Sequence, residues 1–345
     1  MNSKYEDFDA YEAYEAQFDP LRHDRRARRK RRAKPGYQPK QTHQDIIAAS
    51  ADPIGLEAGL NITYRPSRHE ADWLFYSLRP FYDQELIVDV EALVKGGKEA
   101  NVYRCAAHPA TGHEWLAVKV YRPRFFRNLR NDHIYRRGRL TLETSGRPMK
   151  ANDKRLIRAL DKRSNLGQQM MHTSWLMHEY STLELLFDAG AAVPKPLAAA
   201  ENAIIMAYIG NDYGAAPALN EIALDRGEAL FLFKEVMRNV ILMLRFGRIH
   251  ADLSAYNILY WNGKITLIDF PQVVNSRIKK ATHIMGSRVN PDAASLLERD
   301  ITRVCEYFTL QGVRCDAQQI FNHLWQVYVE EDPEVRLADA SHWEE

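Results

Sequence analysis

Hydrophobic positions in the first two thirds of the chain fall mostly in short runs. These runs lie at residues 91–97, 100–108, 114–122 and 203–210. Glycine and proline breakers such as PATG separate them, and their length and β-branched or aromatic content are typical of strands. The run at 203–210 is almost entirely apolar, which predicts a buried strand.

Helical spacing of apolar residues marks three other stretches. The first is residues 174–188, where Gly190 ends the pattern. A longer helix is predicted at 221–246, and more helix follows from about 292 to 330. On the second helix we expect the core face to carry Leu230, Phe233, Met237, Val240, Ile241 and Leu244.

This order of elements predicts an α+β protein with two lobes, joined at about residues 208–214. Charge changes the picture at the N-terminus. Residues 22–40 hold ten Lys and Arg against one Asp, which is typical of a segment without a packed core. The predicted organisation is a disordered acidic and basic tail at 1–45, an N-terminal helical extension at 46–85, an N-lobe at 86–210 with a basic flexible insertion at 122–150, and a helical C-lobe at 211–345.

A hairpin is predicted within HADLSAYNILYWNGKITLIDF, residues 250–270. Asn-Gly at 262–263 favours a type I′ turn, because both central residues of that turn need positive φ. With this pair at the tip, Asn257 lies opposite Ile268. Asn257 and Asp269 then finish at the same end, and their side chains converge if the chain leaves strand geometry at Asp269.

Asp252, Asn257 and Asp269 are the residue types of a phosphoryl-transfer site. Magnesium prefers carboxylate and amide oxygens together with phosphate and water. A separate Asp is needed to orient the nucleophile. The spacing D-x-x-x-x-N matches a kinase catalytic loop, and I-D-F matches the start of its metal-binding motif. Capped or solvated loop ends would account for either half alone, but not easily for both.

Lys119 stands in the middle of the apolar run LAVKVY, where an unpaired ammonium is costly. Glu179 on the following helix is its candidate partner, and both would meet nucleotide phosphates. The glycine turn in GGKEANVY could lay backbone N–H groups over phosphates, although it is no Walker A motif.

Together these pieces resemble the RIO family of atypical protein kinases. The likeness spans roughly residues 50–320 in the correct order. One departure is the pair Lys95-Gly96, which stands just before the loop Gly-Lys where family members usually carry Ser or Thr. The matching pieces are GKEANVY (97–103), LAVKVY (116–121), HEYSTLELLFDAG (178–190), HADLSAYNILY (250–260), LIDFPQVV (267–274) and the Arg-Asp pair in LLERDITRVCEYFTLQGV.

The resemblance implies a trimmed kinase fold without an activation segment, and a serine/threonine kinase or ATPase using ATP and Mg²⁺, with Mn²⁺ in its place as a possibility. Asp252 would be the catalytic Asp, helped by Asp269. Asn257 and Asp269 would hold the metal. The ATP-binding residues would be Gly96, Gly97, Lys98, Glu99, Ala100, Asn101, Val102, Lys119, Glu179, Met206, Tyr208 and Ile209.

Family members act in maturation of the small ribosomal subunit, so the resemblance implies that subunit or its RNA as a partner. The basic residues 22–40 and 122–150 are suited to phosphate backbones, although a generic solubilising tail is the plain alternative. Two other functions stay open. One is a small-molecule phosphotransferase of the aminoglycoside or choline kinase type, and the other is an RNA-binding scaffold that kept the fold.

The remaining composition argues against other classes of protein. The three cysteines have no C-x-x-C spacing, which speaks against a structural zinc site or disulfide framework. No uncharged run approaches the roughly 18 apolar residues of a membrane helix, and the acidic start is unlike a secretory signal. We therefore expect a cytoplasmic protein with no membrane association. His250 is expected to brace the catalytic loop.

Overall fold

The computed structural model describes residues 60–66, 68–97, 100–121, 142, 165–279 and 287–330. All of them belong to one compact unit, Leu60–Glu345. The predicted tail at 1–45 lies outside the described residues, as does the insertion at 122–150 apart from Leu142.

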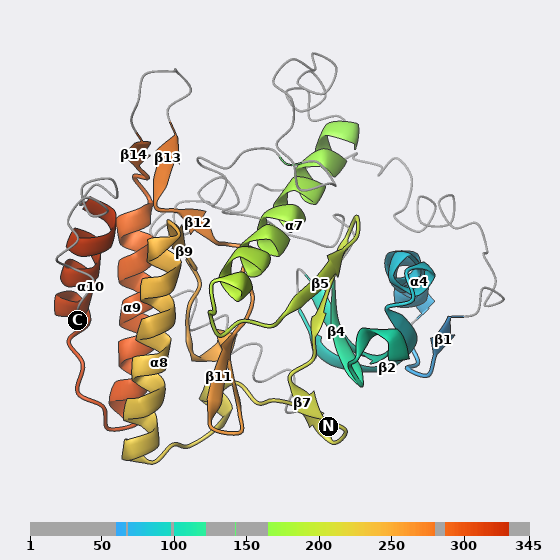
Figure 1. Cartoon of the computed structure of the whole chain (residues 1–345), viewed down its shortest axis with the longest axis horizontal. Helices are drawn as coiled ribbons and strands as arrows, with labels where there is room; N and C mark the ends of the chain where they lie inside the picture. The colour runs from blue at the N-terminus through green and yellow to red at the C-terminus, as the bar shows by residue number, and fades with distance from the viewer. Residues whose placement is uncertain are drawn as a thin grey trace, which may run out of the picture. The chain divides into compact units, whose positions relative to one another are not determined.

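The N-terminal part is built on one six-stranded sheet, ordered β1-β2-β3-β4-β6-β5 (Figure 1). Its neighbouring strands are antiparallel except for β1, which runs parallel to β2. The short apolar runs of the sequence therefore become strands of one sheet, with β3 and β4 in its middle. The strands are β1 (Asn61–Ile62), β2 (Ile87–Gly96), β3 (Ala100–Ala107), β4 (Trp115–Tyr121), β5 (Pro196–Ala199) and β6 (Ala203–Ala207), with a 3-10 turn, η2 (Pro109–Thr111), before β4.

Helix α4 (Arg68–Asp83) packs on this sheet through Leu74, Leu78 and Phe81, which are fully buried against residues such as Val90. Of the helical extension expected at 46–85, residues 46–59 lie outside the described part of the chain and Arg68–Asp83 form this helix. Residues 61–62 form strand β1, which the sequence did not predict. Two residues are too few to show the alternation that marks a strand.

Helix α7 (Asn165–Asp188) begins nine residues before the stretch whose periodicity predicted it. It ends where expected, at Gly190, whose φ of 79° lets the chain turn. Leu176 of this helix is buried with Tyr121 and Ile204 of the sheet. Helix α7 therefore packs on the face of the sheet to which Tyr121 and Ile204 contribute their side chains.

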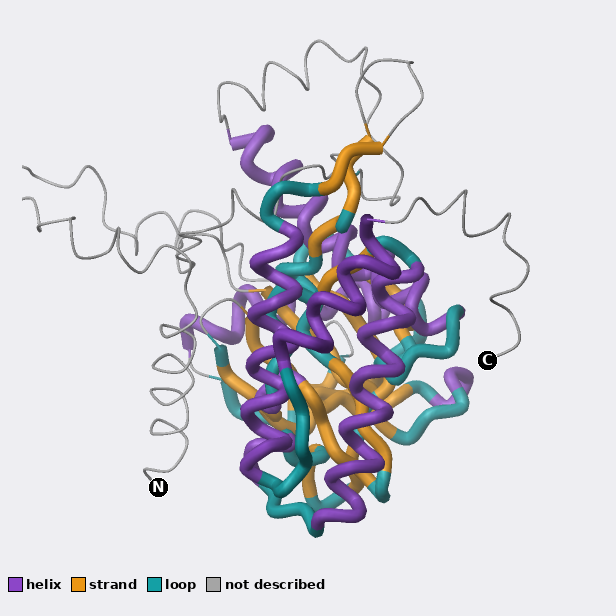
Figure 2. The backbone as a smooth tube through the Cα atoms, turned by 90° about the vertical axis from the view of Figure 1, so that its left-hand side faces the viewer, coloured by secondary structure: helices purple, strands orange, loops and turns teal. Residues whose placement is uncertain are grey.

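The C-terminal part is a group of helices with its own core (Figure 2). Helix α9 lies between and contacts α8 and α10. Gly312, with φ of 85°, breaks the helix expected from 292 to 330 into α9 and α10. The elements are β7 (Gly210–Asn211), β8 (Gly214–Ala215), η4 (Leu219–Glu221), α8 (Arg226–Arg245), β9 (Arg248–Ile249), η5 (Ala255–Asn257), β10 (Ile258–Trp261), β11 (Lys264–Leu267), β12 (Val274–Asn275), β13 (Arg277–Lys279), β14 (Ser287–Val289), α9 (Ala293–Leu310), α10 (Ala317–Trp325) and the π-turn η6 (Gln326–Glu330). No described helix has the length and hydrophobicity needed to cross a bilayer.

The hairpin of β10 and β11 forms in the predicted register. Trp261 pairs with Lys264, and the Ile268 N–H donates to the Asn257 carbonyl over 3.0 Å. Both turn residues at 262–263 have positive φ. Asp269 has φ of 70°, so the chain leaves strand geometry at the residue where convergence required it.

The core face of α8 was only partly predicted. Leu230 is 45% exposed, whereas Leu232 is fully buried. Apolar residues occupy more than one side of this helix, and the buried stripe includes a small residue, Ala229, and a polar one, Asn239. Because Ala229 and Asn239 are not large apolar residues, the buried face does not stand out in the sequence. The helical period therefore pointed to a neighbouring face.

Truncating these two leucines tests the assignment. We expect Leu232→Ala to lower the free energy of unfolding by about 2–5 kcal/mol, because it opens a cavity in the core. The matched control Leu230→Ala should change it by less than about 0.5 kcal/mol. Urea denaturation measures both, and equal losses would contradict the assignment.

Candidate active site

Lys119 projects from the centre of β4 and joins three elements. Its Nζ lies 2.7 Å from Oε1 of Glu179 on α7 and 2.5 Å from Oδ1 of Asp269, which follows β11. Burial alone would lower the pKa of Lys119, but the two carboxylates outweigh it and raise the pKa. The ammonium therefore stays charged inside the fold.

The two carboxylates differ in surroundings. Glu179 is 1% exposed, and burial raises its pKa by more than the attraction of Lys119 lowers it. Burial also acts to raise the pKa of Asp269, yet Lys119 overcomes it and the pKa is lowered. Asp269 is the more exposed partner, at 41%, and remains an anion that faces solvent on one side.

Asp252 lies in the loop between β9 and β10 and is almost fully buried. Arg303 of α9 donates from Nη1 to its Oδ1 over 2.8 Å. Asn257 donates from Nδ2 to the Asp252 carbonyl over 2.9 Å and to Oδ2 over 3.2 Å. The spacing of five residues therefore places Asn257 directly against Asp252.

The backbone of this loop is held by Asp300 of α9. Its two carboxylate oxygens accept the N–H groups of Ala251, at 2.7 Å, and Leu253, at 3.0 Å. Arg299 donates to the Ala251 carbonyl. Ala251 has φ of 63°, a conformation that costs an L-residue about 1–2 kcal/mol. These contacts hold the loop in that conformation.

His250 supports the same loop from the other side. Its Nε2 lies 3.1 Å from the Ile268 carbonyl, which can only accept, so this nitrogen carries the proton. The ring packs on Phe270 with centroids 4.6 Å apart. His250 thus ties the loop of Asp252 to the strand that leads to Asp269.

Two side-chain oxygens in this region, Asn257 Oδ1 and Asp269 Oδ2, are of the type that magnesium binds. Asn257 donates through Nδ2, which turns that nitrogen to Asp252 and leaves Oδ1 to accept. Asp269 holds Lys119 through Oδ1, which leaves Oδ2. Among the described residues no group of three or more His, Cys, Asp or Glu could hold a metal. An ion here would therefore need phosphate or water oxygens to complete its shell.

The glycine turn between β2 and β3 is tight. A Cβ on Gly97 would lie 2.8 Å from the Ala100 carbonyl, so only glycine fits there. Asn101 is 3% exposed, and its Oδ1 accepts from the Gly97 N–H over 3.4 Å. Gly96 is exposed, Val102 is half-buried, and the predicted contacts of Lys98 and Glu99 lie outside the described residues.

The stretch expected to meet adenine lies at the end of β6. Met206 pairs with Ala117 of β4. The Ile209 carbonyl accepts the Ala216 N–H over 2.9 Å. Tyr208 packs edge-on against Trp115, with ring centroids 6.3 Å apart. Adenine binding by these residues stays a prediction.

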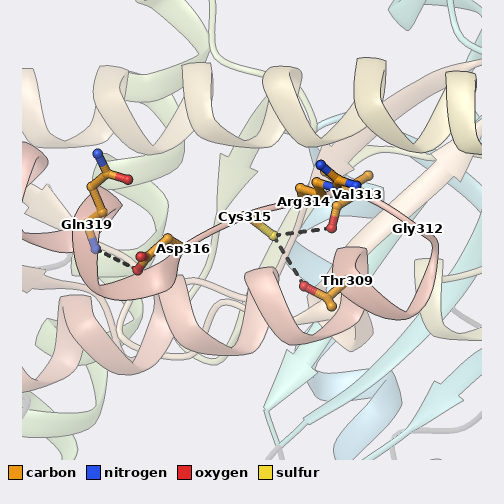
Figure 3. Close-up of a pocket in the computed structure, with 7 residues that line it drawn as sticks. All are labelled: Thr309, Gly312, Val313, Arg314, Cys315, Asp316 and Gln319. Carbon is orange, nitrogen blue, oxygen red and sulfur yellow. Dashed lines mark hydrogen bonds between the residues drawn. The ribbon is translucent and has the colours of Figure 1, made fainter.

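A recess at the turn between α9 and α10 contains none of these residues (Figure 3). Cys315 lies in it, with Sγ 3.4 Å from Thr309 Oγ1. The lining is Thr309, Gly312, Val313, Arg314, Cys315, Asp316 and Gln319.

Sequence reasoning missed Arg303 and the role of Asp300 as a backbone anchor. The sequence did contain a signal for them. Asp300 and Arg303 are charged residues three positions apart on the otherwise apolar stripe of α9. Charged groups on a buried stripe need partners. The sequence could not show that these partners are Asp252 and its neighbours, some 50 positions away.

A two-lobed α+β fold with a lysine between two carboxylates, and with a buried Asp–Asn pair on a braced loop, defines a protein of the kinase-like class. Comparison with protein families matches residues 101–320 to the RIO domain. Because this covers more than half of the chain, the chain belongs to the RIO domain family. The predicted family and trimmed kinase-like fold are confirmed.

Three relatives illustrate the match. A RIO-type serine/threonine-protein kinase Rio1 of Thermoplasma acidophilum is 32% identical over 150 residues, covering 44% of this chain and 72% of the relative. The protein of the same name in Haloferax volcanii is 28% identical over 232 residues, covering 66% of each chain. Human serine/threonine-protein kinase RIO1 is 25% identical over 235 residues, covering 66% of this chain but 34% of the relative. These names support the prediction of a RIO-type kinase enzyme.

The anchoring role of Asp300 can be tested with Asp300→Asn. The amide keeps one acceptor but turns its NH₂ towards a backbone N–H, so one of the two loop contacts is lost. We expect the free energy of unfolding to fall by about 1–3 kcal/mol. Glu298→Gln, on the exposed side of the same helix, should change it by less than about 0.5 kcal/mol. Chemical denaturation of both variants gives the comparison, and an unchanged Asp300→Asn would contradict the role.

Proposed function

We propose that this protein is an ATP-dependent serine/threonine kinase of the RIO type that uses Mg²⁺ for phosphoryl transfer. The observation that carries the proposal is the contact of Lys119 with both Glu179 and Asp269. It brings the strand, the helix and the metal-binding loop expected of a kinase to one point.

Each side chain then has a distinct role. Lys119, held by Glu179, would contact the α and β phosphates. Asn257 and Asp269 would bind the metal through the oxygens that Lys119 and Asp252 leave unused. A magnesium ion, when bound, would neutralise charge on the β and γ phosphates.

Asp252 would orient the attacking hydroxyl or water. Its Oδ1 accepts a hydrogen bond from Arg303 and its Oδ2 accepts one from Asn257. These contacts fix the carboxylate before substrate arrives. The guanidinium also compensates the negative charge of a buried Asp. The loop at Gly96–Asn101 would cover the phosphates, and Met206, Tyr208 and Ile209 would meet the adenine.

The acceptor of the phosphoryl group separates the alternatives. A protein hydroxyl makes the enzyme a kinase, and water makes it an ATPase. Transfer to an aminoglycoside or choline would favour a small-molecule phosphotransferase. An RNA-binding scaffold would show no turnover at all. Family membership favours the first two outcomes.

Turnover of ATP tests the proposal. We expect the wild-type chain with Mg²⁺ to release ADP, and Asp252→Asn and Asp269→Asn to lower kcat by roughly 10²–10⁴-fold. Asn is chosen at position 252 because it keeps a side chain beside the buried Arg303. Asp188→Asn, at the exposed end of α7, is the control and should match wild type. Wild-type protein without magnesium-dependent turnover would reject the proposed function.

The partner we propose is the small ribosomal subunit or its RNA, met in the cytoplasm by the basic residues 22–40 and 122–150. Each Lys or Arg that neutralises a phosphate releases a counterion, so binding should weaken steeply with salt. Nothing in these segments resembles a base-reading motif, and the binding should be independent of sequence.

Removal of residues 1–45 tests this partner. We expect weaker binding to small subunits and a shallower slope of log K against log salt, measured by sedimentation at several salt concentrations. A chain with Arg and Lys at 22–40 changed to Gln keeps the length and should behave like the deletion. Equal binding by all three proteins would exclude the tail as the contact.

A further inference from the structure

A chain of hydrogen bonds links helix α4 to the base of the glycine turn. Its outer end is the carboxylate of Glu70, in the first turn of α4. Its inner end is the backbone N–H of Gly97, which donates to Asn101 Oδ1 over 3.4 Å. Glu70 precedes the stretch that matches the RIO domain, which begins at residue 101.

Asn101 and Tyr103, neighbours on one face of β3, form the middle of this chain. Asn101 Nδ2 donates to the Tyr103 hydroxyl over 2.9 Å and to Glu70 Oε1 over 3.4 Å. The Tyr103 hydroxyl donates in turn to Glu70 Oε1. Asn101 is 3% exposed and Tyr103 fully buried, so both depend on these partners for their polar atoms.

The carboxylate decides which way the amide of Asn101 points. A carboxylate only accepts, so it draws Nδ2 towards itself and leaves Oδ1 facing Gly97. Burial, together with the contact to Glu70, raises the pKa of Tyr103, so its hydroxyl keeps the proton that it donates. If the Asn101 amide were reversed, its Nδ2 would face the Gly97 N–H, and two donors cannot form a hydrogen bond. The Gly97 N–H would then lose this acceptor.

Gly97 has no room for a side chain. A Cβ there would meet the Ala100 carbonyl at 2.8 Å. The hydrogen bond from the Gly97 N–H to Asn101 therefore fixes the residue at which the turn begins. Lys95 lies two positions earlier, and its charge helps to lower the pKa of Asp269.

We propose that Glu70 is a positioning residue for the nucleotide. Through Asn101 and Tyr103 it holds Gly97, the residue from which the chain enters the phosphate-covering turn. This inference rests on the proposed ATP binding and extends its machinery to α4, outside the matched domain.

The test exchanges hydrogen-bond donors and acceptors between Glu70 and Asn101. Asn101→Asp alone sets a second carboxylate against Glu70 and the Tyr103 oxygen. We expect Kd for ATP with Mg²⁺ to rise roughly tenfold, the equivalent of one charge-assisted hydrogen bond. Adding Glu70→Gln supplies an NH₂ donor to the introduced carboxylate and lets the other oxygen of that carboxylate accept from Gly97. The double variant should return to within roughly threefold of wild type.

Calorimetric titration of the full chain with ATP and Mg²⁺ gives Kd, and steady-state turnover of Tyr103→Phe gives its kcat, which should stay within roughly twofold of wild type. Asp83→Asn is the matched control, because it removes a carboxylate from an exposed ion pair with Arg79 on the same helix. It should bind ATP as wild type does. Tyr103→Phe keeps the ring packing and removes the hydroxyl, and should weaken ATP binding roughly three- to tenfold.

Each result decides the question. Weak binding by Asn101→Asp that Glu70→Gln restores supports the inference, since loss of packing alone would not be repaired by a second change. A double variant as weak as Asn101→Asp would overturn it, as would wild-type affinity in Asn101→Asp. If Asn101→Asp fails to fold, Tyr103→Phe decides in its place, and unchanged affinity there overturns the inference. Wild-type protein that binds no ATP would reject the proposed function itself.

Discussion

An ammonium group buried in the centre of a sheet cannot remain there without anions, and this requirement shapes the site around Lys119. One carboxylate comes from α7 and the other from the loop after β11. Neither belongs to the sheet, so the charge ties together elements that are far apart in sequence. Removal of either carboxylate would leave the buried ammonium with one anionic partner in place of two, so both contacts stabilise the fold.

A second constraint acts on the backbone of the loop that carries Asp252. Ala251 and Asp269 both adopt positive φ, a backbone conformation that L-residues rarely take. The cost of this conformation is offset from α9, whose Asp300 and Arg299 hold the peptide groups of Ala251. Helix α9 also supplies Arg303 to Asp252. The rigidity of the loop thus comes from a helix some 50 residues further along the chain.

Membership of the RIO family and the geometry of the site agree with each other. Only 23 positions separate Asp269 from the start of α9, which leaves little room for the long activation segment of ordinary protein kinases. In this chain the loop that carries Asp252 is held by the contacts of Asp300 and Arg303 on α9.

Local signals in the sequence determined the parts that depend on near neighbours. Asn-Gly at 262–263 set the register of the hairpin, and the spacing of Asp252 and Asn257 placed them in contact, because such features act over a few residues. The tertiary structure alone decided which side of α8 is buried, that residues 61–62 join the sheet, and that Arg303 meets Asp252. Those outcomes depend on surfaces brought together from distant parts of the chain, and no period or spacing along the sequence records which surfaces will meet.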